Sequence, residues 1–217
     1  MTGYKVINLA EVIKLKKDEN AKAERAYQTI INAISAFSCP LNEDVENFLK
    51  RKAVTFSEQG LAATFLVFAS HKETPVLIGY FTIANKFLQV PRKRLESNSW
   101  RRRIAKFSKY NEDLRSYELS LPLIAQLGKN YSNEYNKLIS GDELLQIACN
   151  KVCEVLLMSS GKLTYVECED KECLVNFYSS NGFRRFADRP IGKSEEGGNG
   201  SSYLVQMIKY LDTMQTK

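Results

Sequence analysis

The order of predicted elements indicates an α/β protein with a mixed, mostly antiparallel central sheet flanked by helices. Two apolar, β-rich runs, residues 62–69 and 76–84, flank a polar turn that contains Pro75, which is typical of a β-hairpin. In the second half of the chain, strands alternate with amphipathic helices, and two strands in succession close the order. Strict alternation of strand and helix is absent, which argues against a doubly wound parallel sheet.

The elements before the hairpin are helical. Residues 22–37 are predicted to form one helix, and Asn42 is placed to cap a second helix over residues 43–53. The apolar stripe of this second helix repeats at helical spacing: Val45, Phe48 and Leu49.

The second half begins with an apolar strand at residues 117–129, in which Pro122 predicts a bulge or a sheet edge. After a polar loop, a helix begins at Ser140-Gly141-Asp142-Glu143, which matches the capping box with Ser140 as N-cap and Glu143 reaching back. The later elements are a strand, a helix ended by Asn181-Gly182, and two strands: 162–168, 172–180, 183–187 and 203–210. The Gly- and Ser-rich segment 192–202 is predicted to be a mobile loop.

Composition excludes several protein classes. The chain has 217 residues, 44 % of them apolar and 26 % charged, with a formal net charge of +6. These values are ordinary for a globular protein and exclude disordered, collagen-like and coiled-coil classes. We expect a single domain over residues 1–217, with an N-terminal extension at 1–30 and a basic helical insertion at 90–110.

The positive charge is concentrated in that insertion. It holds eight basic residues and one acidic residue, a net charge of +7 that leaves the rest of the chain at −1. In a helix from about residue 96 to 110, Trp100, Ile104 and Phe107 share one face. Three basic residues lie on the opposite face: Arg102, Lys106 and Lys109. A solvated amphipathic helix is the simple interpretation. The functional one is a phosphate-contacting surface that also includes Arg92 and Arg94.

Cysteine and histidine content bears on compartment and metal binding. The chain has five cysteines and one histidine, His71, which lies in a polar turn and is expected to be solvated. The N-terminus has no apolar signal region, and no run reaches the ~18 apolar residues of a membrane span. We therefore expect a cytoplasmic protein with free thiols and no membrane association. Without a CxxC motif or a second histidine, zinc sites and hydrolase triads have little support.

The strand, loop and helix start between residues 119 and 141 can bind an anion. A helix N-terminus offers N–H groups and a positive dipole end, and Lys137 adds a charge for a phosphate or pyrophosphate. Most such junctions bind no ligand, and Asp142 in the first turn satisfies the dipole by itself.

A motif about 40 residues later adds to this. The sequence Phe177-Tyr178-Ser179-Ser180-Asn181-Gly182-Phe183, followed by the closing strand at 203–207, resembles the GCN5-related N-acetyltransferases (GNAT). Segments 39–53, 64–67 and 78–84 resemble the toxin-like branch, whose members acetylate the amino group of aminoacyl-tRNA and are often paired with an antitoxin. The resemblance covers roughly residues 35–211. It implies acetyl-CoA as cosubstrate, no metal, and possible partners in tRNA and an antitoxin protein; a homodimer stays open.

The resemblance also implies site residues. The strand 125–129 pairs with the pantetheine arm, and the N–H of Leu127 or Gly128 polarises the thioester carbonyl. Tyr178 gives its proton to the leaving thiolate, because their ordinary pKa values, about 10 and 8.5, are close. The residues expected to bind the cosubstrate are Leu127, Gly128, Lys129, Asn136, Lys137, Leu138, Ile139, Ser140, Gly141 and Asp142. The general base has three candidates: Glu118, Glu167 and Glu169.

The cofactor loop departs from the family pattern, Arg/Gln-x-x-Gly-x-Gly/Ala. Asn136, Ile139 and Gly141 occupy its three defined places, so only the last glycine matches. Two function classes therefore stay open. One is an N-acetyltransferase whose acceptor is aminoacyl-tRNA, or else a protein or small-molecule amine. The other is a catalytically weak GNAT-like binding module that uses its basic face.

Overall fold

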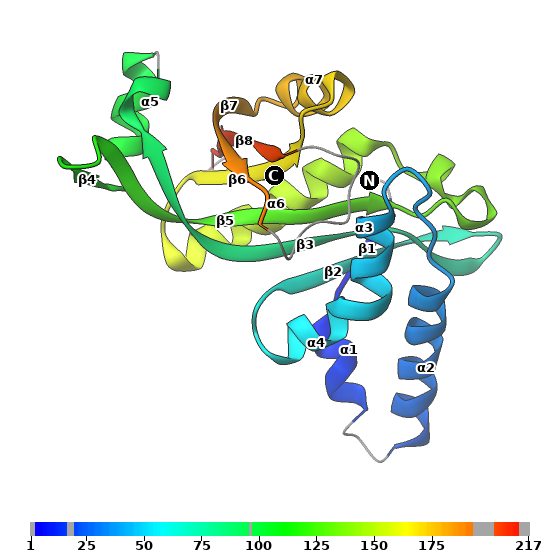
Figure 1. Ribbon diagram of the computed structural model, residues 1–217. Helices are drawn as coiled ribbons and strands as arrows, with labels where there is room; N and C mark the ends of the chain where they lie inside the picture. The colour runs from blue at the N-terminus through cyan, green and yellow to red at the C-terminus, as the bar shows by residue number, and fades with distance from the viewer. Residues whose placement is uncertain (1–2, 17–19, 96, 193–201, 213–217) are drawn as a thin grey trace. The chain divides into compact units, whose positions relative to one another are not determined.

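The computed structural model describes residues 3–16, 20–95, 97–192 and 202–212 (Figure 1). Most of the loop predicted to be mobile, 192–202, lies outside the described residues. The chain forms two compact units, each assembled from two stretches. Unit 1 is Met1–Ala84 with Ala125–Ala148, and unit 2 is Asn85–Ile124 with Cys149–Lys217. The expectation of a single domain stays a prediction.

The strands follow the order β1-β2-β3-β5-β6-β8-β7, and β4 pairs with β5. β5 and β6 are parallel, while β1–β2, β2–β3, β4–β5, β6–β8 and β7–β8 are antiparallel. The predicted mixed, mostly antiparallel α/β class is therefore confirmed. The strand bounds are β1 Lys5–Asn8, β2 Ala63–His71, β3 Thr74–Pro91, β4 Lys109–Asn111, β5 Ser116–Lys129, β6 Leu163–Glu169, β7 Arg184–Pro190 and β8 Tyr203–Tyr210.

The α-helices in the described part of the chain are α1 Leu9–Leu15, α2 Ala21–Ser35, α3 Glu43–Asn47, α4 Ala53–Glu58, α5 Asn98–Ala105, α6 Gly141–Ser159 and α7 Glu172–Ser180. The predicted helix at 43–53 is only partly right, because it continues to Glu58 and contains a π-helical turn, Phe48–Lys52, between α3 and α4. Its cap is confirmed, since the side chain of Asn42 accepts a hydrogen bond from the Val45 N–H at 3.2 Å.

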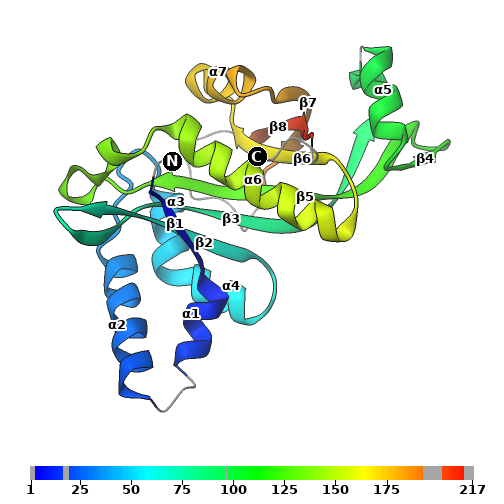
Figure 2. The ribbon, with the colours of Figure 1, turned by 180° about the vertical axis from the view of Figure 1, so that it is seen from behind.

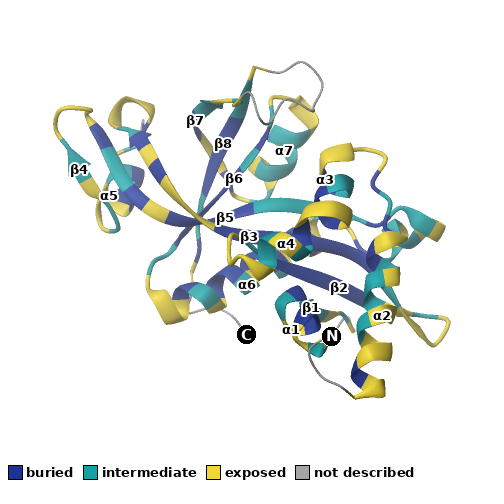
Figure 3. Ribbon diagram, turned by 60° about the horizontal axis from the view of Figure 1, so that its bottom comes forward, coloured by how far each residue is buried: buried dark blue, intermediate teal, exposed yellow. Residues whose placement is uncertain are grey.

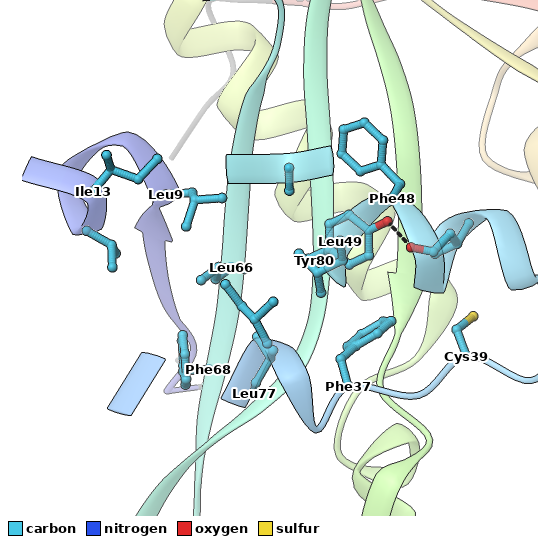
Figure 4. Packing of buried hydrophobic residues seen from close by; sticks show 14 residues of the cluster. Leu9, Ile13, Phe37, Cys39, Phe48, Leu49, Leu66, Phe68, Leu77 and Tyr80 are labelled. Atoms are coloured by element: carbon cyan, nitrogen blue, oxygen red, sulfur yellow. Dashed lines mark hydrogen bonds between the residues drawn. The ribbon is translucent and has the colours of Figure 1, made fainter. Parts of the chain in front are cut away.

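The hydrophobic core of unit 1 lies between its sheet and the helices α1 to α4 (Figure 4). Leu9 of α1, Leu49 of the π-helical turn and Tyr80 of β3 are all fully buried there. Tyr80 packs edge-on against Phe37, with ring centroids 5.3 Å apart. Its hydroxyl donates to the carbonyl of Val45 at 2.5 Å, so burial leaves no unpaired polar group on the ring. Figure 2 shows β1 beside β2, with α1 following it directly.

Two glycines let backbones approach closely in unit 1. A Cβ atom on Gly128 of β5 would lie 2.4 Å from Cγ1 of Val45, and one on Gly79 of β3 would lie 2.9 Å from the Gly128 carbonyl oxygen. The Gly79 position also faces the Leu144 side chain of α6. β3 and β5 therefore pass each other where neither can carry a side chain.

Unit 2 contains the sheet of β6, β7 and β8, and the basic insertion predicted at 90–110. The insertion consists of a 3-10 turn at Arg92–Arg94, then α5, then β4. Trp100 and Ile104 are buried, as expected for the apolar face of α5, while Arg102 and Arg103 between them are exposed; Figure 3 colours the chain by burial. The prediction of a helix to residue 110 is wrong, because Lys109 lies in β4, opposite Glu118 of β5.

Pro122 lies within β5, which has β3 and β6 as its neighbours, so the predicted sheet edge is wrong. Proline has no N–H to donate, and it is tolerated because parallel pairing with β6 is recorded only at Leu123 and Ile124. Its carbonyl still accepts a hydrogen bond from the Thr164 hydroxyl at 2.9 Å. The predicted stop of α7 is confirmed, with Gly182 at a φ of 82°.

Candidate active site

The end of β5 in unit 1 is fixed by one buried side chain, Asn130, which is 2 % exposed. Its amide nitrogen donates to the Leu77 carbonyl at 2.7 Å, and its oxygen accepts from the N–H of Ser38 at 3.1 Å and of Ser132 at 3.0 Å. Its backbone N–H donates to the Ile78 carbonyl at 2.8 Å. Ile78 is the residue skipped in the β2–β3 register, so Asn130 joins the strand end to a β-bulge.

The loop after β5 contains a 3-10 segment, Ser132–Leu138, that is kinked at Asn133 and Glu134, where φ is 48° and 59°. Ile139 follows with φ −148° and ψ 139° and is 2 % exposed. The family pattern has glycine at this position. Because Ile139 is extended, a β-branched residue fits without strain. Its side chain anchors the loop in the core.

Two side chains hold the carbonyl groups of this loop. The Lys129 Nζ donates to the carbonyls of Asn136 at 3.1 Å and Ile139 at 3.2 Å. The Tyr4 hydroxyl donates to the carbonyl of Leu138 at 3.2 Å. In a trans peptide, the next N–H points opposite to the carbonyl, and no peptide bond described is cis. The N–H groups of Lys137 and Ile139 therefore point away from Lys129 and Tyr4.

The predicted capping box of α6 is confirmed. The Ser140 N–H donates to Glu143 Oε2 at 2.8 Å, and the Glu143 N–H donates to Ser140 Oγ at 3.1 Å. These hydrogen bonds from Ser140 are the main reason that the pKa of Glu143 is lowered. Tyr4 also donates to Glu143 Oε1 at 3.2 Å, so the same hydroxyl contacts both the loop and the helix cap.

The residues predicted to bind the cosubstrate thus lie together in unit 1, on β5, the loop and the first turn of α6. Lys137 is mostly exposed and pairs with Glu134 at 2.5 Å, an ion pair that solvent weakens. Ala125, Gln126 and Leu127 are half-exposed, whereas Gly128 is buried. Their roles in binding acetyl-CoA stay predictions.

Tyr178 lies in unit 2 on α7, where it is half-buried. The rings of Phe177 and Phe183 pack edge-on against it, with centroids at 5.0 and 5.6 Å. Burial is the main cause that raises the pKa of Tyr178 above its ordinary value, and Cys168 and Cys149 add to the shift. A thiolate, whose conjugate acid has an ordinary pKa of about 8.5, is then the weaker base. Burial therefore favours the protonated phenol of Tyr178, and its role as proton donor to the leaving thiolate stays a prediction.

The three candidate bases already have hydrogen-bond or ion-pair partners. Glu118 accepts from Asn111 at 2.8 Å and Gln89 at 3.2 Å. Glu167 is tied to Arg189 at 2.9 Å and accepts from Gln206 at 2.7 Å. Glu169 pairs with Lys171. Geometry gives none of them a free carboxylate.

The five basic residues predicted to contact nucleic acid are all exposed: Arg92, Arg94, Arg102, Lys106 and Lys109. Other cations of the segment pack against the protein instead. Arg101 donates from Nε to the Leu95 carbonyl at 2.6 Å, and the Arg103 guanidinium lies 4.8 Å from the Tyr210 ring centroid. Of the five, Arg94 pairs with Asp188 at 3.8 Å and Arg92 lies 6.0 Å from the Tyr110 ring centroid, while Arg102, Lys106 and Lys109 present exposed side chains to a ligand.

His71 was expected in a solvated turn, but it ends β2 and is half-buried, with the Tyr135 ring 5.8 Å away. All five cysteines are free thiols. The described residues contain no cluster of His, Cys, Asp and Glu able to hold a metal ion. None of the described helices is long and apolar enough to span a membrane.

Comparison with solved structures identifies the architecture. AtaT complexed with acetyl-methionyl-tRNAfMet matches with a TM-score of 0.54 and 19 % identity, over 79 % of this chain and 85 % of AtaT. The fold is GNAT-like. A mutant of KacT matches this GNAT-like chain with a TM-score of 0.53 and 16 % identity, over 80 % of this chain and 86 % of KacT.

A third structure, AtaTR bound with acetyl-CoA, matches with a TM-score of 0.51 and 16 % identity, and covers 94 % of this chain and 93 % of its own. At these identities the likeness establishes the fold. No protein-family model matches the GNAT-like chain. No curated protein matches it either.

Two residues of the site were missed in the sequence. Tyr4 is 134 positions from the carbonyl that it contacts, and nothing in its neighbourhood marks that contact. Asn130 carried a usable signal, because an asparagine directly after an apolar strand often bonds to nearby backbone.

Proposed function

We propose that this chain is an acetyl-CoA-dependent N-acetyltransferase that transfers the acetyl group to the amino group of aminoacyl-tRNA. The observation that carries the proposal is the loop between β5 and α6. Lys129 and Tyr4 hold its carbonyls, so its N–H groups are oriented before any ligand arrives. Oriented backbone N–H groups beside a helix N-terminus are a general way to bind phosphate.

Acetyl-CoA is a substrate in this scheme and supplies the acetyl thioester. The pyrophosphate would be bound by the loop from Asn136 to Gly141, with Lys137 as a nearby charge. The half-exposed stretch of β5 at residues 125–127 would pair with the pantetheine arm. The N–H of Leu127 or Gly128 would polarise the thioester carbonyl.

The chemistry is a direct transfer. The neutral amine nitrogen attacks the thioester carbon, a C–N bond forms, the C–S bond breaks, and the amine loses one proton to solvent. Tyr178 would donate a hydrogen bond to the leaving sulfur and pass its proton to it, and solvent would then return a proton to the Tyr178 oxygen.

The acceptor assignment rests on charge. Between Asn85 and Leu119 the chain has ten basic and four acidic residues, and five of the exposed cations are those predicted to contact phosphate. AtaT, whose fold this chain shares, has a structure in complex with acetyl-methionyl-tRNAfMet. Another AtaT structure contains the C-terminus of the antitoxin AtaR and acetyl-CoA. An antitoxin encoded beside this chain would support the same assignment.

Two measurements test the proposal. Calorimetric titration with acetyl-CoA should show binding, and incubation with labelled acetyl-CoA should label aminoacyl-tRNA but not deacylated tRNA. Labelling of peptide or small-molecule amines alone would overturn the acceptor. Absence of acetyl-CoA binding would overturn the enzyme and leave a GNAT-like binding module.

The basic surface has its own test. Reversal of Arg102, Lys106 and Lys109 to Glu should weaken tRNA binding and its salt dependence without changing acetyl-CoA affinity. Reversal of three exposed cations of unit 1, Lys14, Lys22 and Arg25, is the matched control with the same change in net charge. Equal losses in both variants would mean that net charge, not this surface, binds tRNA.

A further inference from the structure

Two tyrosines face each other on the hairpin formed by β4 and the start of β5 in unit 2. Tyr110 and Tyr117 are direct cross-strand partners, with ring centroids 5.0 Å apart and an interplanar angle of 56°. Both are half-exposed, so part of each ring is open to solvent. Because side chains alternate along a strand, this tyrosine face is separate from the face that carries Glu118.

A cation accompanies the pair. The guanidinium of Arg92 lies 6.0 Å from the Tyr110 ring centroid, and Arg92 is itself exposed. Its backbone N–H donates to the Arg115 carbonyl at 3.0 Å, which ties the 3-10 turn to the hairpin. Hydrogen bonding to the Tyr110 side chain is the main cause that raises the pKa of Arg92; Glu112 contributes a smaller part.

Another aromatic residue of the same segment provides a contrast. Trp100 also has cations near its ring, with Arg103 at 5.7 Å and Arg184 at 5.6 Å, but it is only 7 % exposed. The two arginines therefore pack against a buried ring that a ligand cannot reach. Tyr110 and Tyr117 have the same chemistry on an accessible surface, amid an excess of exposed positive charge.

We propose that Tyr110 and Tyr117 form a stacking platform for an unpaired base of single-stranded RNA, with Arg92 beside them to contact its phosphate. The inference rests on the proposed nucleic-acid acceptor and names the part of it that the hairpin contacts. Aromatic rings and guanidinium planes stack on any base, and single-stranded ends expose bases for this purpose. The surrounding cations attract the phosphates, while the tyrosines distinguish RNA from other polyanions.

The test distinguishes binding to the bases of RNA from binding to its phosphates. Fluorescence anisotropy measures the affinity for a labelled ten-nucleotide single-stranded RNA, and for a strand of the same length in which abasic sites replace the nucleotides. The wild type should bind the base-containing strand about 5- to 150-fold more tightly, the range for stacking of one base. The double variant Tyr110→Leu, Tyr117→Leu should lose this preference with its salt slope unchanged, whereas the double Phe variant keeps it.

Arg92→Gln should reduce the salt slope by about 0.7, the value for one phosphate contact on a single strand. Phe87→Leu is the matched control, since Phe87 is an aromatic residue of β3 that is 65 % exposed and outside the tyrosine pair. A preference for bases that survives in the Leu double variant would overturn the platform.

The outcomes also distinguish this inference from the proposed function. If the wild type acetylates aminoacyl-tRNA but binds both strands equally, the platform is wrong and the enzyme stands. Tight binding of an acidic peptide with no preference for bases would assign the surface to a protein instead. If neither strand nor tRNA binds, the platform and the acceptor assignment both fail.

Discussion

Substitution of Lys129 by Met should weaken acetyl-CoA binding, because this ammonium group is what fixes the loop carbonyls. The change keeps the length and apolar stem of the side chain and removes its two donated hydrogen bonds, at 3.1 and 3.2 Å. The released carbonyls of Asn136 and Ile139 could then rotate toward water. The N–H groups on the opposite side of the loop would lose their orientation.

The size of the effect follows from those two bonds. A hydrogen bond to a charged group contributes about 1.5–3 kcal/mol. Lys129 is half-buried, so water replaces part of what is lost, and about one bond in net terms is the expected cost. If this cost falls on the ligand-binding form of the loop, the Kd for acetyl-CoA rises about 10- to 150-fold.

Isothermal titration calorimetry measures the Kd, and thermal unfolding without ligand gives a second measurement. If Lys129 positions the loop, the unliganded protein also loses stability, with Tm falling about 2–4 °C per kcal/mol. A lysine that only touched the phosphate would leave that Tm unchanged. Lys22→Met is the control, since Lys22 is exposed on α2, outside the loop, and its loss should change the Kd less than threefold. A Kd for Lys129→Met within threefold of wild type would refute the reasoning.

Two further changes test other parts of the structure. Tyr178→Phe should lower acetyl transfer about 100-fold with the acetyl-CoA Kd within twofold, and unchanged turnover would remove Tyr178 from the reaction. Because burial raises its pKa, Tyr178 loses its proton only above the ordinary value of about 10. A loss of turnover with rising pH that begins below pH 9 and is absent in the Phe variant would contradict this. Gly128→Ala places a Cβ 2.4 Å from Val45 and should reduce the free energy of unfolding by about 1–3 kcal/mol, whereas Gly3→Ala, with open space around it, should not; equal unfolding midpoints in denaturant would contradict this.

Local chemistry explains which elements the sequence could predict. The hairpin of β2 and β3, the capping box at Ser140 and the strand β8 depend on residues close together in the chain, so their patterns are visible in it. β1 and β4 have only four and three residues; β1 pairs with the distant strand β2, whereas β4 pairs with the start of β5 in a short hairpin. No period of apolar residues can mark strands that short.

The candidate site divides in the same way. The loop from residue 136 to 142 and Tyr178 were predicted from the family resemblance, which rests on a local motif and its spacing; their roles stay predictions. The hydrogen bond from the Tyr4 hydroxyl to the Leu138 carbonyl could not be predicted, because it joins residues 134 positions apart. The role of Ile139 was also hidden, since only the observed extended backbone shows why a glycine is not needed there.

The division of the chain into two interleaved units constrains its synthesis. Ala84 ends the first stretch of unit 1, but Gly128 and Asn130, which complete that unit beside β3, belong to a stretch that ends at Ala148. At about 5–20 residues per second, a ribosome needs roughly 2–9 seconds to add the 45 residues from Asn85 to the end of β5 at Lys129. During that interval β3 waits with an unpaired edge, the state in which strands bind wrong partners. The nascent chain is therefore exposed to aggregation through β3 until β5 has been made.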